Sequence, residues 1–587
     1  MNSSLNRIFK VVWSKVRMVW MAVSEITTSN GKQQSLTRVT RTLTVAAAVM
    51  TGAGAIAGPP PANTLPTMGQ VAAGIAAIGT NGNSMTVTQS SNRTVINWNT
   101  FDIATNASVN FVQPNSNAVA LNRVLSSNAS QIYGNLSANG QVYLVNPSGV
   151  YFAPGAQVNV GGIVATTHDM SNADFMAGST TFNRNGATGS VVNEGTITTS
   201  LNGYIAMLAP QVRNSGLLLA QAGTVAMAAG ENITLNFGPT SKLESVTVTA
   251  AQLNTLVENR LAVKAPNGLV ILSARAANQL SASVINSGTI EATSATQQGG
   301  RIVLQGSQVT NTGTLDASSS VAQAGTIQIN GQQVNLSGRI LVNSPTQGGT
   351  IQVQATDSLA VNQAVLSAIG QQQGGQIQLT STQLSITSST LDASSVQSNG
   401  NGGQGGKIQL AANQIVVTDS TINVDGDAQG GNVVMAGSNA SSLAVMQSAN
   451  PLSSSNTGNS NNPSNPANPN PQTPLPPSSL VLGGSTVLSS RSRNGQAGNV
   501  TLTGDDLQLN NTLVIDASGA TQGGTVLVGG DWHGSNGTYQ ATTVTMAQGV
   551  LIDASATQNG NGGTVVLWSD VTNANSLTQA FGTILAR

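Results

Sequence analysis

The sequence predicts an all-β protein built as a parallel β-solenoid, in which short strands stack coil upon coil. One pattern recurs along the chain: a small residue or Gly, then Gly, one further residue and alternating apolar residues. The gaps between its copies are mostly 24 to 31 residues. A fixed period of this length indicates stacked supersecondary units. The repeated position is occupied by Gly300, Gly325, Gly349, Gly375, Gly406, Gly431, Gly498, Gly524 and Gly563.

Each repeat contains short runs in which apolar and polar residues alternate, as in Gly325-Thr326-Ile327-Gln328-Ile329-Asn330. Alternation places one face inward and one outward, as in a half-buried strand. A parallel stack buries the inward Val, Ile and Leu, and it pairs every backbone group with a neighbouring coil. A leucine-rich repeat is the rival for this period, but its Leu-x-x-Leu spacing and helical return segments are missing.

The composition supports extended β-structure and excludes several classes of protein. Charged residues make up 7% of the chain and aromatic residues 3%, against about 25% charged residues in ordinary globular domains. The chain has no Cys, which excludes disulfides and thiolate metal sites. Residues 1–45 hold seven Lys/Arg and one acid, so the remainder has 14 basic and 20 acidic residues, a balance of −6. A mildly acidic body is a poor nucleic-acid binder.

The first 57 residues have the pattern of an unusually long secretory signal, which we expect to be helical. Leu43–Ile56 is an apolar run preceded by Arg38 and Arg41, too short to span a membrane. Ala55 and Ala57 supply the small residues that a signal peptidase needs, so we predict cleavage after Ala57. The mature chain is then expected to have no stable transmembrane segment.

Asn146-Pro147-Ser148-Gly149-Val150 predicts a tight turn between two strands in the segment from Phe111 to Thr167. Pro147 presets a turn φ, and Gly149 can adopt a positive φ. The side chain of Asn146 can accept a hydrogen bond from the backbone two residues on.

Two parts of the sequence resemble type V secreted proteins. The basic N-terminal segment resembles their extended signal-peptide region, and residues 65 to about 240 resemble the filamentous haemagglutinin N-terminal domain of two-partner secretion. The box reads NPSGV where many relatives have NPNGI, and a separate NPNL box is missing, which favours the subgroup of high-molecular-weight adhesins and haemopexin-binding exoproteins. The matching segments are Ile96-Asn97-Trp98-Asn99-Thr100-Phe101-Asp102-Ile103, Val109-Asn110-Phe111-Val112-Gln113-Pro114, Ala120-Leu121-Asn122-Arg123-Val124, Gly140–Val150 and Ile163-Val164-Ala165-Thr166-Thr167.

The resemblance implies a right-handed parallel β-helix that is exported through the periplasm to the cell surface or beyond. Its implied partner is an outer-membrane TpsB-type transporter with periplasmic POTRA domains. It also assigns a secretion motif, made of Asn146, Pro147, Ser148, Gly149 and Val150 together with Asn122 and Arg123. A purely structural role for the box, as a turn that nucleates the first coils, stays open beside that assignment.

Two segments interrupt the repeats. Thr249–Leu261 has helical spacing and predicts a short helix outside a coil, and extra-helical hairpins are expected to be minor. Residues 447–479, rich in Ser, Asn and Pro, predict a disordered insertion. The predicted organisation is an extended signal peptide (1–57), a Pro-rich spacer (58–64), a two-partner secretion domain (65–310), β-helix repeats (311–446), the insertion (447–479) and further β-helix repeats (480–587) with no polar cap, which suggests a truncated end.

The sequence offers little to support catalysis, a metal or a cofactor, and we expect none of the three. His168 and His533 are far apart and are expected to be surface turn residues. The repeated Asp-Ala-Ser tags at Asp316, Asp392, Asp516 and Asp553 predict hydrogen bonding in coil turns. The best remaining acid pairs are Asp425/Asp427 and Asp505/Asp506.

We therefore expect a non-enzymatic secreted adhesin that attaches to a host cell or matrix surface, or to neighbouring bacteria, through a repetitive polar surface. One alternative is a haem- or haemopexin-binding exoprotein that binds through protruding loops, with 447–479 as the candidate loop. The other is a polysaccharide-active enzyme, which would need converging carboxylates.

Overall fold

The computed structural model describes residues 9–14, 19–24, 58–278, 280–296, 298–395, 402–437, 477–537 and 539–587. It contains two compact units, Met1–Ile56 and Ala57–Arg587. In the first unit, β1 (Phe9–Ser14) and β2 (Val19–Ser24) form an antiparallel hairpin that pairs Phe9 with Ser24. The helix expected for the signal region is therefore wrong for these residues. Both segments are rich in Val and Trp, which favour strands over helices.

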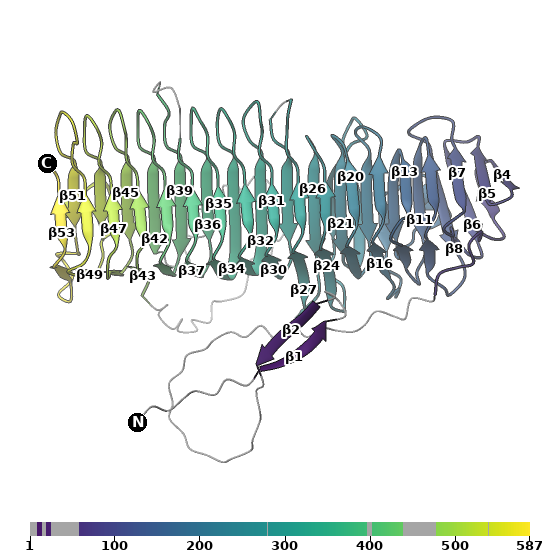
Figure 1. The fold of residues 1–587 in the computed structure, drawn as a ribbon, viewed down its shortest axis with the longest axis horizontal. Helices are drawn as coiled ribbons and strands as arrows, with labels where there is room; N and C mark the ends of the chain where they lie inside the picture. The colour runs from purple at the N-terminus through teal and green to yellow at the C-terminus, as the bar shows by residue number, and fades with distance from the viewer. Residues whose placement is uncertain are drawn as a thin grey trace, which may run out of the picture. The chain divides into compact units, whose positions relative to one another are not determined.

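The second unit is a parallel β-helix, as predicted, whose strands stack side by side along its length (Figure 1). Each coil contributes strands to three faces. The first face contains β6 (Arg93–Trp98), β8 (Val119–Val124), β11 (Gln141–Val145), β14 (Gly162–Thr166), β18 (Tyr204–Leu208), β21 (Thr224–Ala229), β26 (Leu269–Ala274), β29 (Arg301–Gln305), β32 (Thr326–Leu336), β34 (Thr350–Asn362), β36 (Gln376–Thr380), β39 (Lys407–Ala412), β42 (Asn432–Gly437), β45 (Asn499–Thr503), β48 (Thr525–Val528) and β51 (Thr564–Leu567).

The second face follows a corner of each coil, and β32 and β34 run through that corner onto it. Its other strands are β9 (Ser130–Ile132), β12 (Val150–Phe152), β16 (Ser190–Asn193), β19 (Gln211–Asn214), β24 (Thr255–Asn259), β27 (Ala282–Asn286), β30 (Gln308–Asn311), β37 (Gln383–Thr387), β40 (Gln414–Thr418), β43 (Ser479–Gly483), β46 (Asp506–Leu509), β49 (Thr543–Met546) and β52 (Leu577–Ala580).

The third face closes each coil with short strands. They are β5 (Ser84–Gln89), β7 (Ser108–Val112), β10 (Asn135–Ala138), β13 (Gln157–Val160), β17 (Thr196–Thr199), β20 (Leu217–Ala220), β25 (Ala262–Lys264), β28 (Thr289–Glu291), β31 (Thr314–Asp316), β33 (Arg339–Leu341), β35 (Val365–Ser367), β38 (Thr390–Asp392), β41 (Thr421–Asn423), β44 (Val487–Ser489), β47 (Val514–Asp516), β50 (Leu551–Asp553) and β53 (Thr583–Leu585). At the N-terminal end of the stack, β3 (Gln70–Ala73) and β4 (Ala76–Asn81) pair antiparallel with β6 and β5 and cover the edges of those strands.

The core is a set of apolar columns that run through the interior of the stack. In one column Ile302 pairs with Ile327, and Ile327 pairs with Ile351; all three side chains are fully buried. Each strand contributes alternate residues to such columns, as β36 does with Ile377 and Leu379. Burying a side chain of this size contributes about 1.5–3 kcal/mol, so a coil gains its stability mainly by stacking on its neighbours.

A second apolar cluster lies outside the coils and is covered by extra-helical elements. The covering elements are α1 (Asn172–Met176) and an antiparallel sheet of β15 (Thr181–Asn183), β22 (Asn232–Phe237) and β23 (Leu243–Val248). Phe175 and Phe182 pack there against Tyr143, a residue of β11. The expected minor hairpins and short helix are thus present, but the helix lies at 172–176.

The helix predicted at Thr249–Leu261 is wrong, because that segment contains β24. Thr255, Val257 and Asn259 are buried, while β24 pairs in register with β19 and β27. Stacking between coils has overridden the local helical spacing of Leu253, Leu256 and Val257.

The predicted insertion at 447–479 lies almost entirely outside the described residues. Its flanks lie close together: a Cβ added to Gly437 would lie 3.3 Å from Cβ of Ser478. Across the gap, β40 pairs directly with β43, and β42 pairs with β45. The chain therefore leaves and re-enters the stack at one corner. The predicted C-terminal limit is slightly too late, since β43 begins at Ser479.

A ladder of buried Asn side chains marks one interior corner of five successive coils. Each Nδ2 donates to the Oδ1 of the next Asn, over 2.8, 2.8, 2.8 and 2.7 Å. All five side chains are fully buried. Four belong to the Asn-x-Gly repeats visible in the sequence, whereas Asn259 is followed by Arg and Leu. The members of this asparagine ladder are Asn193, Asn214, Asn259, Asn286 and Asn311.

Replacing Asn259 by Ala removes two ladder bonds and leaves the Oδ1 of Asn286 buried without its partner. We expect the free energy of unfolding to fall by about 3 kcal/mol. Asn335, exposed on β32, provides the matched control, and Asn335→Ala should change it by less than about 0.5 kcal/mol. Urea unfolding followed by far-ultraviolet circular dichroism measures both, and equal midpoints would contradict a stabilising ladder.

Candidate functional site

The NPSGV box forms a tight turn between β11 and β12, as predicted. Gly149 N–H donates to Asn146 O over 2.9 Å, and Ser148 N–H donates to Asn146 Oδ1 over 3.0 Å. Gly149 has a φ of +126°, which disfavours any residue with a side chain. The predicted roles of Asn146 and Gly149 in the turn are therefore confirmed. Pro147 is exposed at the tip, whereas Val150 points into the core.

Neighbouring coils hold this turn from both sides. The buried Asn146 side chain donates from Nδ2 to Asn128 O over 2.9 Å and to Ser130 Oγ over 3.0 Å, both in the preceding coil. Its backbone N–H donates to Thr166 O, at the end of β14 in the following coil, over 2.9 Å. The turn is thus part of the stack, with only its tip presented to solvent.

The structure brings Asn122 and Arg123 next to the box. They lie on β8, where they pair with Leu144 and Val145, the two residues immediately before Asn146. The Asn122 side chain is fully buried and accepts a hydrogen bond from Trp98 Nε1 over 3.0 Å. Its Nδ2 also donates to Tyr143 O over 3.3 Å, so Asn122 joins β6, β8 and β11.

Arg123 fastens the extra-helical segment to the coils. Its Nε lies 2.8 Å from Asp169 Oδ2, and its remaining guanidinium nitrogens donate to Met170 O and Asn172 Oδ1 over 2.7 and 2.6 Å. These residues lead into α1, which covers the outer apolar cluster. The geometry therefore gives Asn122 and Arg123 positions that organise the fold around the box.

His168 lies in the same region and is fully buried, so its expected place in a surface turn is wrong. Its Nε2 lies 3.0 Å from Gly230 O, next to β22. Burial lowers the pKa of His168 to about 4, with the nearby Arg184 charge acting in the same direction. His533 is exposed, as expected, in the short 3₁₀ helix η1 (Trp532–Gly537).

The candidate acid pairs are occupied by structural contacts. Asp425 lies 2.8 Å from Arg491 NH2, and Asp427 lies 3.9 Å from Arg493 NH1. Asp505 accepts from the Ser478 N–H and Oγ over 2.7 and 2.8 Å and from the Tyr539 hydroxyl. These carboxylates join segments that meet at coil corners.

The Asp-Ala-Ser tags behave as predicted. In each one the Asp Oδ1 accepts from the Ser N–H two residues later, over 2.9–3.0 Å. In the described part of the chain, no group of three His, Cys, Asp or Glu side chains is placed to hold a metal ion.

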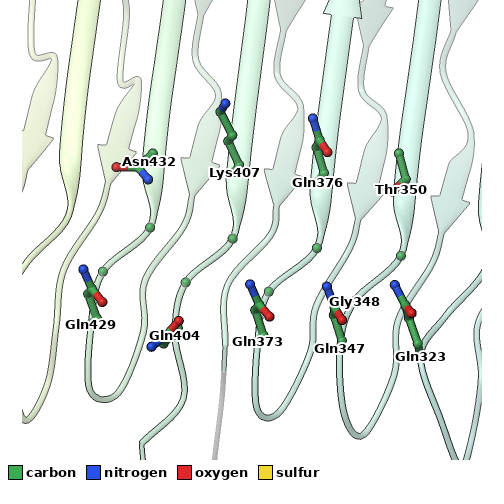
Figure 2. A pocket seen from close by; sticks show the side chains of 17 residues that line it. Gln323, Gln347, Gly348, Thr350, Gln373, Gln376, Gln404, Lys407, Gln429 and Asn432 are labelled. Carbon is green, nitrogen blue, oxygen red and sulfur yellow. The ribbon is translucent and has the colours of Figure 1, made fainter. Parts of the chain in front are cut away.

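A polar groove runs across successive coils between the third face and the first, and Figure 2 shows its side chains. Its volume is about 350 Å³. One bank is a glutamine row, and the other bank is formed by the first residues of β34, β36, β39 and β42. Paired glycines form the floor. The glycines are predicted by the sequence repeat, whereas the Gln two residues before Gly325, Gly349, Gly375, Gly406 and Gly431 was missed. The glutamine row consists of Gln323, Gln347, Gln373, Gln404 and Gln429.

The predicted signal cleavage at Ala55 and Ala57 lies outside the described residues. Among the residues that the structure does describe, no helix is long and apolar enough to cross a membrane.

Comparison with known families decides what this β-helix is. Residues 57–317 match the TPS secretion domain, and residues 6–55 match the extended signal peptide of the type V secretion system. The chain therefore carries a two-partner secretion domain behind an extended signal peptide. Such a protein crosses the periplasm to the extracellular side, and its secretion domain implies a cognate outer-membrane TpsB transporter. The match includes the box, Asn122, Arg123 and the whole asparagine ladder.

Similar proteins come from Haemophilus influenzae. Two heme/hemopexin-binding proteins, one of them from strain Rd, are 36% and 34% identical over 256 and 253 residues. These matches cover 42% and 39% of this chain but only 28% and 27% of the relatives, so the chain matches under a third of their length. The crystal structure of the HMW1 secretion domain is 25% identical with a TM-score of 0.48, covering 63% of this chain and 95% of that one.

The buried His168 predicts a pH-dependent loss of local stability. Its pKa in the folded state, about 4, is below the unfolded value of 6.5, so below pH 6.5 protons bind preferentially to the unfolded segment. The contribution of neutral His168 to the local free energy of unfolding is fully present above pH 6.5. It falls by about 3 kcal/mol as the pH drops to 4. Hydrogen-exchange protection of Thr167 and Asp169, corrected for intrinsic rates, measures this loss. His168→Gln should abolish that part of the pH dependence, and an unchanged pH profile in this variant would contradict the assignment.

Proposed function

We propose that this exoprotein is a non-enzymatic adhesin that attaches to host cells, matrix or neighbouring bacteria through repeated polar surface. The observation that supports this best is the groove, where equivalent polar side chains from successive coils form parallel rows. Many equivalent weak contacts give strong attachment only when they are engaged together. A binder of this kind has no need of a deep pocket or a catalytic centre.

The second candidate function is binding of haem or a haem carrier. It is favoured by the relatives described as heme/hemopexin-binding proteins. A haem ligated through histidine would use His533, because the chain has two histidines and His168 is buried. The His533 ring lies 4.9 Å from the Trp532 ring and 5.4 Å from the Trp568 ring, between centroids.

One experiment separates the two functions. The secreted protein is tested for saturable binding to epithelial cells and matrix proteins, and in parallel for binding of haemopexin and haemin. If the protein is an adhesin, it binds to cells or matrix. Any Soret shift of haemin is then the same in the parent protein and in His533→Ala. Haemopexin binding, or a Soret shift lost in His533→Ala, without attachment to cells or matrix would favour the second candidate.

We also propose that the transporter recognises the NPSGV box during secretion, and that the box nucleates folding of the first coils. Its exposed Pro147 supports recognition, and its buried Asn146 supports nucleation. Asn122 and Arg123 belong to the same proposal, since they hold the strand beside the box.

The double variant Asn146→Ala/Pro147→Ala is expected to accumulate in the periplasm, because it loses both the bonds to the preceding coil and the turn tip. Immunoblots of periplasm and culture medium measure the distribution. Pro154→Ala, in the exposed turn after β12, is the matched control and should be secreted normally. Normal secretion of the double variant would contradict the proposed role of the box.

A further inference from the structure

The glutamine row is fixed in register by the backbone. The carbonyl of Gln373 accepts from Gly348 N–H over 3.0 Å, and the carbonyl of Gln404 accepts from Gly374 N–H over 2.8 Å. Gln429 continues the pattern by accepting from Gly405 N–H over 2.9 Å. Each side chain therefore occupies an equivalent place on its coil, and neighbouring coils are spaced by about 4.8 Å.

The side chains of this row differ from those of the asparagine ladder in one decisive respect. Inside the stack, each Asn amide bonds to the next at 2.7–2.8 Å. Within the described residues, the amides of the glutamine row (Figure 2) make no such bond to one another, and all five of these residues are exposed. A row that served only to lock coils together would bond like the ladder. These donors and acceptors instead face solvent.

The groove stays open because its floor cannot carry side chains. A Cβ on Gly348, Gly374 or Gly405 would collide with the carbonyl oxygens of Ala368, Ala393 and Val424 respectively. The opposite bank is polar as well, with Thr350, Gln376, Lys407 and Asn432. Lys407 is the one charged residue of the lining, which contains no acid and no aromatic ring.

This chemistry selects the class of ligand. Nucleic acid needs clustered positive charge, and an apolar peptide needs an apolar surface to bury. Uncharged carboxamides in a repeating row match a ligand that repeats hydroxyl donors and acceptors along its length. A sugar unit in an extended chain has a length close to the coil spacing, so successive units can meet successive glutamines.

We propose that the groove binds a linear, hydroxyl-rich polysaccharide that lies along the stack. This inference deepens the proposed adhesive function by naming the ligand class. With no aromatic platform for stacking, a single sugar is held weakly, and affinity comes from engaging several coils at once. Affinity should therefore rise steeply with the length of the glycan.

The test uses the secreted full-length chain and three series of linear oligosaccharides, cello-, chito- and hyaluronan-derived, from disaccharide to hexasaccharide. Calorimetry should find at least one series in which the hexasaccharide binds far more tightly than the disaccharide. The triple variant Gln347→Ser/Gln373→Ser/Gln404→Ser should lower the affinity for that hexasaccharide by on the order of tenfold or more.

A matched control is available on the strands beside the groove. Gln328, Gln352 and Gln378 pair with one another on β32, β34 and β36, and within the described part of the chain none of them lines the groove or has a side-chain hydrogen bond to a residue that does. Their triple Ser variant should change affinity less than about twofold. Both triple variants should keep the circular dichroism spectrum of the parent. Lys407→Gln should weaken hyaluronan fragments and spare the two neutral series.

The inference is overturned if no series binds, if affinity does not grow with length, or if the two triple variants lose affinity equally. Its failure is distinguishable from failure of the adhesin proposal. If the groove triple variant still attaches to cells, the groove is not the adhesive site, and the adhesin proposal stands. If the parent protein attaches to no cell or matrix but binds a glycan, and the groove variant abolishes that binding, the adhesin proposal is contradicted. The groove proposal then stands.

Discussion

Backbone hydrogen bonds between successive coils are the interaction on which the rest of this protein depends. Its strands are mostly three to six residues long, too short to be stable alone. They persist because each one pairs with the coil before and the coil after. A slip of one residue would turn a column such as Ile302, Ile327 and Ile351 toward solvent. Register is therefore the quantity that the sequence must encode, and the asparagine ladder encodes it where the coils of the secretion domain meet.

The secretion domain places its distinctive residues in that same network. Asn146 in the turn donates hydrogen bonds to the coils on either side, and Arg123 joins the neighbouring strand to the segment leading into α1. The residues that we propose for recognition and for the start of folding are consequently held by the same few hydrogen bonds. This explains why the turn interpretation and the secretion interpretation of NPSGV were so hard to separate from the sequence, and why Pro147, at the exposed tip, is the residue most able to distinguish them.

Much of the fold was predictable because its signals are local and repeated. The Gly positions and the alternating apolar residues predict the stack, while the Asp-Ala-Ser tags predict their own turns. Features that depend on distant segments were not predictable. His168 is buried by a sheet whose strand β22 lies about sixty residues later, and Asn259 joins the ladder without the Gly that marks the others. The helix predicted at 249–261 was wrong for the same reason, because pairing with neighbouring coils determines the structure of that segment.

The closeness of Gly437 and Ser478 has a consequence for how such proteins can vary. Because the two ends of the excursion almost touch, the coils before and after it pair as if the intervening chain were absent. Lengthening a loop whose ends are already together adds only a slowly growing entropic cost. This corner of the stack is thus a position where new sequence can be acquired without changing any core residue. Natural variation in surface properties can therefore accumulate at this corner while the columns beneath stay constant.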